Sequence, residues 1–157
     1  MAQRLYVMVG VPGAGKTTYA RTHLRQAVRV SLDDLRLMFA GVAYDPRFEP
    51  IVAEAAAALL DALAARAAEW RFDVVLDATN VTRAYRRAAI ERARRFGLEP
   101  VCVFLDTPLE RAFERNLARR HAVPESVLLR FHDQLEPPSP DEGFAEIRVV
   151  AASRRSS

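Results

Sequence analysis

Short apolar runs alternate with longer amphipathic stretches along the chain. Because the short runs are nearly continuous in valine, leucine and other apolar residues, they are typical of strands buried in a parallel sheet. The predicted strands are Leu5–Val9, Val28–Ser31, Phe72–Leu76, Val101–Leu105 and Ala145–Val150. The stretches between them carry apolar residues at helical spacing. They predict helices over Gly15–Gln26, Asp33–Phe39, Pro50–Trp70, Thr82–Phe96, Pro108–Arg119 and Pro124–Leu135.

The order of these elements predicts the fold class. Strands that alternate with helices form parallel sheets covered on both faces. We therefore predict an α/β, three-layer fold with a five-stranded parallel sheet and helices on both faces. No internal repeat or linker-like segment divides the chain. We expect one domain over residues 1–151, with a small helical lid at about 115–135 and a disordered tail over 152–157.

Composition narrows the class of protein. Half of the 157 residues are hydrophobic, and no apolar run approaches the length of a membrane span. The N-terminus leads directly into a predicted strand and shows no signal-peptide pattern. The single cysteine, Cys102, allows no intrachain disulfide and is typical of a reducing compartment. These features predict a cytoplasmic protein with no membrane partner, and they leave its oligomeric state open.

The choice of basic residues is uneven. Of the 23 lysines and arginines, which contribute to a net charge of +3, only Lys16 is a lysine. An arginine-rich and alanine-rich chain is typical of a GC-rich genome, so the arginines by themselves do not indicate a nucleic-acid partner. The lone lysine indicates a site that requires a compact ammonium group rather than a planar guanidinium.

A phosphate-binding motif surrounds this lysine. The stretch GVPGAGKT, residues 10–17, matches G-x-x-x-x-G-K-[S/T] between a predicted strand and a predicted helix. In such a P-loop, backbone N–H groups and the helix N-terminus bind phosphate oxygens. We expect Lys16 to reach the β- and γ-phosphates of a nucleoside triphosphate and Thr17 to bind Mg²⁺. The predicted nucleotide contacts from this segment are Gly10, Pro12, Gly13, Ala14, Gly15, Lys16, Thr17 and Thr18.

Carboxylates follow the second and third predicted strands, at the edge where ligands bind in open parallel sheets. In VSLDDLR, Asp33 is placed to accept a proton from an acceptor hydroxyl, and Arg36 lies on the same helix face. The alternative is that Asp33 only caps the helix. In FDVVLDATN, Asp77 is placed to bind Mg²⁺, and Thr79 and Asn80 are candidate substrate contacts. The alternative is that these side chains only satisfy a turn.

Four stretches, taken in order, resemble a known family. GVPGAGKTT, SLDDLR, DATNVTRAYRR and RNLARRHAVPESVL are similar to the 5′-kinase domain of phage and bacterial polynucleotide kinases and their stand-alone relatives, over about residues 4–150. The resemblance implies a P-loop kinase fold, ATP and Mg²⁺ as cofactors, and transfer of the γ-phosphate to the 5′-hydroxyl of a polynucleotide. It also implies that Asp33 is the general base and that Arg36 contacts a phosphate of the acceptor.

The same resemblance implies a lid arginine that stabilises the transferring phosphoryl group. The matching stretch is RNLARRHAVP, which is one residue shorter than the phage version between its arginines and its proline. Arg119 is the best match and Arg115 a supporting contact, while Arg120 is the alternative after a one-place shift. We therefore predict Lys16, Asp33 and Arg119 as catalytic residues. We also expect Arg115 and Arg119 to contact ATP.

The identity of the acceptor stays open at this stage. Arginines crowd the predicted helix over 82–96, namely Arg83, Arg86, Arg87, Arg92, Arg94 and Arg95. Such a face would attract a polyanion, and Arg83 is expected to meet substrate. The alternative is a solvated face opposite an apolar side that includes Tyr85. Other readings of the function are a small-molecule kinase acting on a sugar, nucleoside or antibiotic alcohol, and a non-catalytic ATP-binding switch. The adenine pocket is expected at Pro137–Phe144, for which a plain connecting loop is the alternative.

Overall fold

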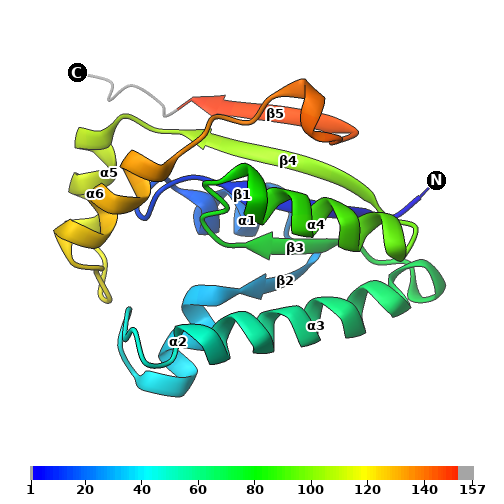
Figure 1. Ribbon diagram of the computed structural model, residues 1–157, viewed down its shortest axis with the longest axis horizontal. Helices are drawn as coiled ribbons and strands as arrows, with labels where there is room; N and C mark the ends of the chain where they lie inside the picture. Colours follow the sequence, from blue (N-terminus) through cyan, green and yellow to red (C-terminus); the bar gives the residue numbers. More distant parts are fainter. Residues whose placement is uncertain (1, 152–157) are drawn as a thin grey trace.

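The computed structural model describes residues 2–151 (Figure 1). Its strands are β1 (Arg4–Val9), β2 (Val28–Ser31), β3 (Val74–Asp77), β4 (Glu99–Asp106) and β5 (Glu146–Ala151). Its helices are α1 (Lys16–His23), α2 (Leu32–Ala40), α3 (Glu49–Trp70), α4 (Arg83–Arg95), α5 (Leu109–Leu117), α6 (Glu125–Gln134) and a 3₁₀ turn, η1 (Pro140–Glu142). Every predicted strand and helix is present, with bounds that differ by a few residues. The predicted tail over 152–157 lies outside the described residues. Within residues 2–151, no helix combines the length and apolar character that a membrane span requires.

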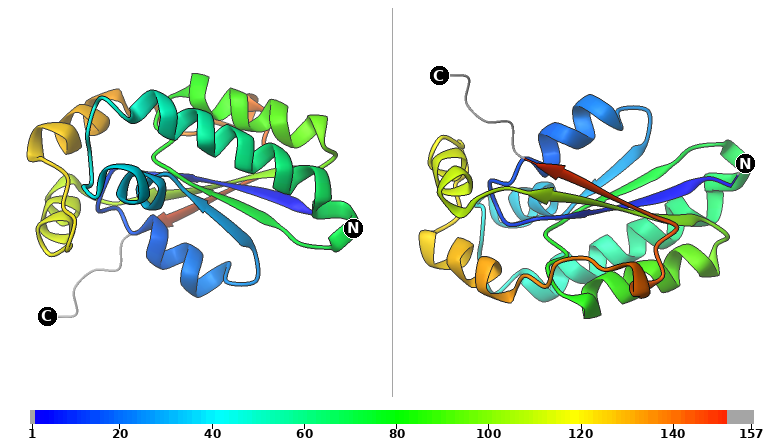
Figure 2. Two further views of the ribbon diagram at one scale, coloured as in Figure 1. Left: turned by 90° about the horizontal axis from the view of Figure 1, so that it is seen from below. Right: turned by 90° about the horizontal axis from the view of Figure 1, so that it is seen from above.

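The strands form one parallel sheet in the order β2-β3-β1-β4-β5. Because β1 is central and its side chains alternate, Leu5 and Val7 belong to the core beneath α3 and α4, whereas Tyr6 and Met8 belong to the core beneath α1. Figure 2 shows α3 and α4 on one face of the sheet and α1 on the other. The predicted three-layer α/β fold is confirmed. The loops that follow β1, β2 and β3 meet at one edge of this sheet.

The start of α2 leaves Asp33 free to take part in a site. Ser31 is the N-cap of this helix, and its Oγ accepts a hydrogen bond from the Asp34 backbone N–H at 3.2 Å. Because the cap position is already filled by the last residue of β2, the alternative that Asp33 caps the helix is wrong. The helix ends at Ala40 and is capped by Gly41, whose φ of 71° lies in the left-handed region that favours glycine.

One face of α4 differs from the prediction. Tyr85, expected on the apolar side, is 61% exposed, whereas Arg86 is fully buried. Arg86 tolerates burial because each of its three guanidinium nitrogens has a hydrogen-bond partner. Its Nε and Nη2 donate to the Glu142 carboxylate at 2.7 and 3.2 Å, and its Nη1 donates to the backbone carbonyls of Asn80 and Val81. A guanidinium is stable in a protein interior only when its charge and its donors are satisfied in this way.

The segment Pro137–Phe144 is a connecting loop that packs against α4. It contains η1, where Ser139 and Glu142 form a capping box, and Glu142 is in turn held by Arg86. The segment lines neither of the two pockets at the carboxyl ends of the strands. The structure therefore gives no support to an adenine pocket at this position and agrees with the alternative of a connecting loop.

Candidate active site

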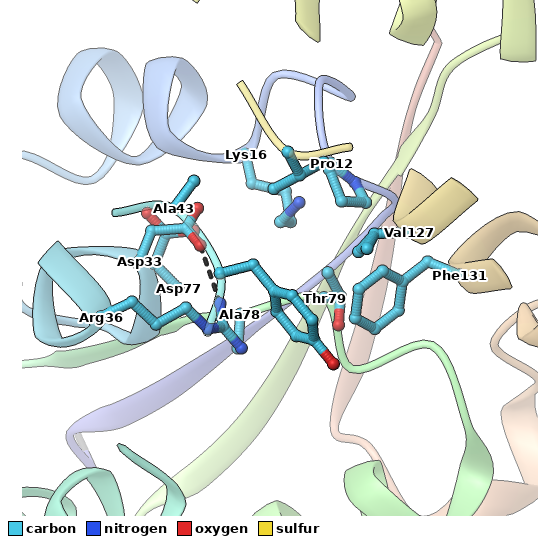
Figure 3. Close-up of a pocket in the computed structure, with 12 residues that line it drawn as sticks. Pro12, Lys16, Asp33, Arg36, Ala43, Asp77, Ala78, Thr79, Val127 and Phe131 are labelled. Atoms are coloured by element: carbon cyan, nitrogen blue, oxygen red, sulfur yellow. Dashed lines mark hydrogen bonds and ion pairs between the residues drawn. The ribbon is translucent and has the colours of Figure 1, made fainter. Parts of the chain in front are cut away.

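The carboxyl ends of β1, β2 and β3 meet at two adjoining pockets. An open cleft of about 860 Å³ runs along the P-loop and the start of α1, and its volume is typical of ligand pockets. Beside it lies a small recess of about 20 Å³ with side chains from α2, β3 and α6. Figure 3 shows the recess, with Lys16 on one side and Asp33 and Arg36 on another. Lys16 and Asp33 line both pockets.

The conformation of the P-loop depends on its glycines. Gly13 has a φ of 84°, and a Cβ at this position would overlap the backbone carbonyl of Ala112 in α5. The Gly10 N–H donates to the Thr79 carbonyl at 3.0 Å, which ties the P-loop to the loop after β3. Gly10 lines neither pocket, and Pro12 lines the recess. The other predicted nucleotide contacts of this segment line the open cleft: Gly13, Ala14, Gly15, Lys16, Thr17 and Thr18.

Lys16 is held where its ammonium group can meet phosphates. The residue is buried, and Nζ donates to the Val11 carbonyl at 2.9 Å. Burial lowers the pKa of Lys16, although the negative charges of Asp77 and Asp33 act in the opposite direction. A polyphosphate beside Nζ would add more negative charge and favour the protonated form. The site is therefore electrostatically suited to a nucleotide.

Thr17 and Asp77 form the pair predicted to bind Mg²⁺. The Thr17 hydroxyl donates to Asp77 Oδ2 at 2.8 Å, and the Asp77 side chain is only 3% exposed. Within residues 2–151, no group of three or more His, Cys, Asp and Glu side chains is arranged to hold a metal ion. The two oxygen donors still fit Mg²⁺, which proteins bind through one or two carboxylates together with water and substrate phosphates. Phosphate oxygens of a nucleotide would have to complete the coordination.

Asp33 lies at the junction of the two pockets, among positive charges. Arg36 Nη1 donates to its Oδ1 at 2.8 Å, and Arg119 Nη2 donates to its Oδ2 at 3.2 Å. Burial acts to raise the pKa of Asp33. The positive charges of Lys16, Arg36 and Arg119 outweigh burial, so the pKa of this carboxyl lies below its ordinary value. The carboxylate is therefore ionised at neutral pH and able to accept a proton.

Glu49, at the start of α3, is a site residue that the sequence does not reveal. Its carboxylate accepts hydrogen bonds from Arg36 Nε and Nη2 at 2.8 and 3.0 Å, which is a bidentate pair. Arg36 is thereby shared between Glu49 and Asp33, and both acids compensate its charge. An acidic residue at a helix N-terminus is common because of the helix dipole, so no local signal distinguishes this contact.

The arginines of the predicted lid face the open cleft. Arg115, near the end of α5, donates from Nη1 to the Ala14 carbonyl at 2.9 Å, while Arg119 contacts Asp33. Arg120 also lines the cleft but forms no ion pair within the described residues. Arg119 and Arg120 are the two alternatives for the lid arginine, and of these the structure brings Arg119 into contact with Asp33.

The recess has an apolar wall, which no motif in the sequence reveals. Its members come from the loop after α2 and from the segment that includes α6: Ala43, Tyr44, Val123, Val127 and Phe131. Arg130 donates from Nη2 to the Tyr44 hydroxyl at 3.2 Å, and its guanidinium carbon lies 5.7 Å from the centre of that ring. An acceptor in the recess would have this wall on one side and the Asp33 carboxylate on another.

The three remaining predicted substrate contacts lie in different surroundings. Thr79 lines the recess. Asn80 is buried with a φ of 44°, and its Nδ2 donates to the Met8 carbonyl at 2.8 Å, so its side chain holds the loop after β3 against β1. Arg83 lines neither pocket and is paired with Asp141 at 2.8 Å. The structure therefore brings Thr79 to the site but does not bring Asn80 or Arg83 to it.

The parallel sheet, the P-loop and the carboxylates at the strand ends together define the P-loop kinase fold. A family model described as an AAA domain matches residues 5–138. The chain belongs to this family, which is a family of P-loop kinases.

Known proteins show what the chain is similar to. L-seryl-tRNA(Sec) kinase of Methanococcus maripaludis is 23% identical over 138 residues, which cover 85% of this chain and 53% of that protein. A chain of the Pnkp1/Rnl/Hen1 RNA repair complex is 28% identical with a TM-score of 0.70, over 85% of this chain and 44% of that one. A sugar kinase from Janibacter sp. HTCC2649 is 24% identical with a TM-score of 0.63, over 95% and 85% of the two chains. The chain thus spans about half the length of the first two relatives.

Proposed function

We propose that this protein transfers the γ-phosphate of ATP to an alcohol hydroxyl bound in the recess. The observation that carries the proposal is the position of Asp33, which lines both the cleft and the recess and is ionised. A carboxylate between a phosphate-binding loop and a second pocket is suited to orient an acceptor hydroxyl and to take its proton. The oxygen of that hydroxyl forms the new bond to phosphorus, and ADP leaves.

In this proposal the cationic side chains act by position and charge. Lys16 binds the β- and γ-phosphates, and Arg115 and Arg119, within the proposed lid over residues 115–135, neutralise charge on the transferring group. When Arg119 turns from Asp33 to the phosphates, the Asp33 carboxylate loses one neutralising partner and becomes a stronger base. The same movement would therefore assemble the phosphate site and activate the general base.

Two side chains of the chain would hold the metal in this proposal. Thr17 and Asp77 offer the oxygen donors, and they are already in contact with each other. Bound Mg²⁺ would supply further neutralisation of the phosphate charge. The burial of Asp77 keeps its carboxylate in one place at the end of β3.

We propose the 5′-hydroxyl of a polynucleotide as the acceptor. Arg36 lines the recess beside Asp33, and a guanidinium has five N–H donors, so donors remain for an acceptor phosphate after Glu49 and Asp33 are bound. The similarity to a chain of an RNA repair complex, at 28% identity, supports this choice. The similarity to a kinase named for a seryl-tRNA substrate points to RNA as well.

A small uncharged alcohol is the second candidate acceptor, and the Glu49 contact favours it. Because Glu49 and Asp33 compensate the charge of Arg36, the recess offers little net attraction to an acceptor phosphate. The apolar wall of the recess would pack against the carbon skeleton of such an alcohol. On α4, Arg83 and Arg86 are paired with acids too, so this helix presents fewer free charges than its sequence suggests.

The test is phosphate transfer from γ-labelled ATP with Mg²⁺. The acceptors are 5′-hydroxyl DNA and RNA oligomers and, in parallel, a panel of sugars and nucleosides. Wild type is compared with Lys16→Ala, with Asp33→Asn and with Arg25→Gln, an exposed arginine outside both pockets. We expect label at the 5′ end, a loss of about 10²–10⁴-fold in Asp33→Asn, and an unchanged rate in Arg25→Gln.

The other outcomes are equally informative. Label on small alcohols alone would replace the polynucleotide by the second candidate acceptor. ATP binding without product on any alcohol would contradict the kinase proposal and favour a nucleotide-binding switch. Full activity in Asp33→Asn would remove this residue from the role of general base.

A further inference from the structure

Arg29, on the edge strand β2, contacts the carboxylate proposed to hold the metal. Its Nε donates to Asp77 Oδ2 at 2.9 Å, and its Nη1 lies 3.2 Å from Asp34 Oδ2. The residue is largely covered and lines the open cleft. One guanidinium thus bridges a buried carboxylate at the end of β3 and an exposed carboxylate at the start of α2.

The ion pair between Arg29 and Asp77 is not required to join β2 to β3. These strands are already paired along the whole of Val28–Ser31, with Ser31 opposite Asp77. The buried Asp77 charge, by contrast, does require compensation, since an isolated carboxylate in the interior is strongly unfavourable. Arg29 supplies a full positive charge at hydrogen-bond distance. Its contact therefore acts on the electrostatics of Asp77 rather than on the sheet.

The contacts of Asp77 are arranged on one side of its carboxylate. Thr17 Oγ1 and Arg29 Nε both reach Oδ2, whereas no hydrogen bond from residues 2–151 reaches Oδ1. One oxygen is thus held and neutralised, and the other is available to a cation or to cation-bound water. A contact of this kind fixes the orientation of a metal ligand. The positive charge of the guanidinium also weakens the attraction between this carboxylate and a metal cation.

We propose that Arg29 is a positioning residue for the metal site. It orients Asp77 through Oδ2 and weakens the binding of a free divalent cation. The cation therefore enters the site together with the nucleotide. The proposal rests on the proposed function, because the metal concerned is the one used in that reaction. Arginine suits this role because its planar guanidinium carries several N–H donors in a fixed geometry and here reaches two carboxylates at once. Asp77 by itself is a weak metal ligand because Arg29 compensates its charge. The phosphates of a nucleotide would add further oxygen ligands and negative charge.

The test measures metal binding in the absence of nucleotide, with Mn²⁺ as the probe and its electron paramagnetic resonance signal as the readout. Wild type is compared with Arg29→Gln, which keeps hydrogen-bonding capacity but removes the charge. We expect Mn²⁺ to bind about tenfold more tightly to Arg29→Gln, since a hydrogen-bonded ionic contact at Asp77 is lost. Equal Mn²⁺ affinity in the two proteins would overturn the proposal. A residue with a merely structural role would not produce a gain in metal affinity.

Two controls locate the effect. Arg25→Gln removes an exposed arginine outside both pockets and should leave the Mn²⁺ affinity at the wild-type value. Adding Asp77→Asn to Arg29→Gln should abolish the gain, and a gain that survives this change would place the metal elsewhere. If Arg29→Gln does not fold, Arg29→Met takes its place, because it also removes the positive charge and keeps an apolar side chain of similar length. Wild-type Mn²⁺ affinity in that variant would then overturn the proposal.

A separate measurement distinguishes this inference from the proposed function. ATP binding by wild type is measured in EDTA, where the metal site plays no part. Failure of wild type to bind ATP at all would contradict the proposed function. Normal ATP binding with unchanged Mn²⁺ affinity in Arg29→Gln would contradict only the role of Arg29.

Discussion

Two groups of arginines in this protein form ion pairs of similar length in different surroundings. Beside the P-loop, Arg36 and Arg119 reach Asp33 at 2.8 and 3.2 Å, from partly exposed positions at the pockets. On α4, Arg86 reaches Glu142 at 2.7 Å in the interior, where both side chains are almost fully buried. The first group lies where a ligand could replace its partners, whereas the second joins α4 to the segment before β5.

An arginine-rich sequence alone therefore does not locate a functional surface. The α4 helix has the densest run of arginines, yet Arg83, Arg86 and Arg92 are all paired with acids there. What distinguishes the pocket arginines is the cavity beside them. We therefore expect substitutions on α4 to change stability and substitutions at the pockets to change phosphate transfer.

The largest effect on stability is expected for Arg86→Met. This change leaves the Glu142 carboxylate buried without its partner, which costs about 3–5 kcal/mol of the free energy of unfolding. The matched control is Arg83→Met on the same helix, where the partner Asp141 is exposed and we expect little or no loss of stability. Urea unfolding measures both. Equal losses in the two variants would show that burial does not separate these ion pairs.

A large effect on transfer, with little effect on stability, is expected for Arg119→Gln. Loss of one donor to the transferring group slows the reaction about 10²–10³-fold, measured in a single turnover with the acceptor found in the labelling experiment. The comparison is Arg120→Gln, for which we expect a much smaller loss because no contact places Arg120 at Asp33. A larger loss in Arg120→Gln would mean that the lid arginine is one place further along the chain.

An intermediate effect is expected in the pH dependence of stability. The pKa of Asp33 lies below the ordinary value of 3.8, so the folded state favours the ionised carboxyl. Its contribution to stability is present above the unfolded-state pKa and is lost as the pH falls through the folded-state pKa. Asp33→Asn should therefore be less stable than wild type at neutral pH, and the difference should narrow below about pH 4. A constant difference from pH 7 to pH 2 would contradict the ion pairs at Asp33.

The smallest effect is expected for Glu49→Gln. Removing this charge frees Arg36, so an acceptor with a phosphate next to its hydroxyl should gain affinity relative to the same acceptor without the phosphate. We expect a change of about fivefold or less in the ratio of the two KM values, since the pair is partly exposed. An unchanged ratio would indicate that Arg36 does not contact the acceptor phosphate.

The fold and the phosphate-binding half of the site could be predicted from the sequence because their determinants are local. A parallel strand buried on both faces is a continuous apolar run, as in Leu5–Val9, and the P-loop is one contiguous motif. The positions of Asp33 and Asp77 follow from the rule that parallel strands present their carboxyl ends at one edge. These features depend on neighbours in the chain or on a general property of the sheet.

The residues around the acceptor pocket, and the acid that pairs with each arginine, depend on contacts that form only when the elements pack together. Glu49 meets Arg36, and Arg29 meets Asp77, through contacts between segments far apart in the chain. Whether an arginine is a free charge or a buried link depends on whether an acid from another segment reaches it, as Glu142 reaches Arg86. Ion pairs carry no local pattern of hydrophobic positions, so periodicity cannot reveal them, and only the packing of the elements determines which charges meet.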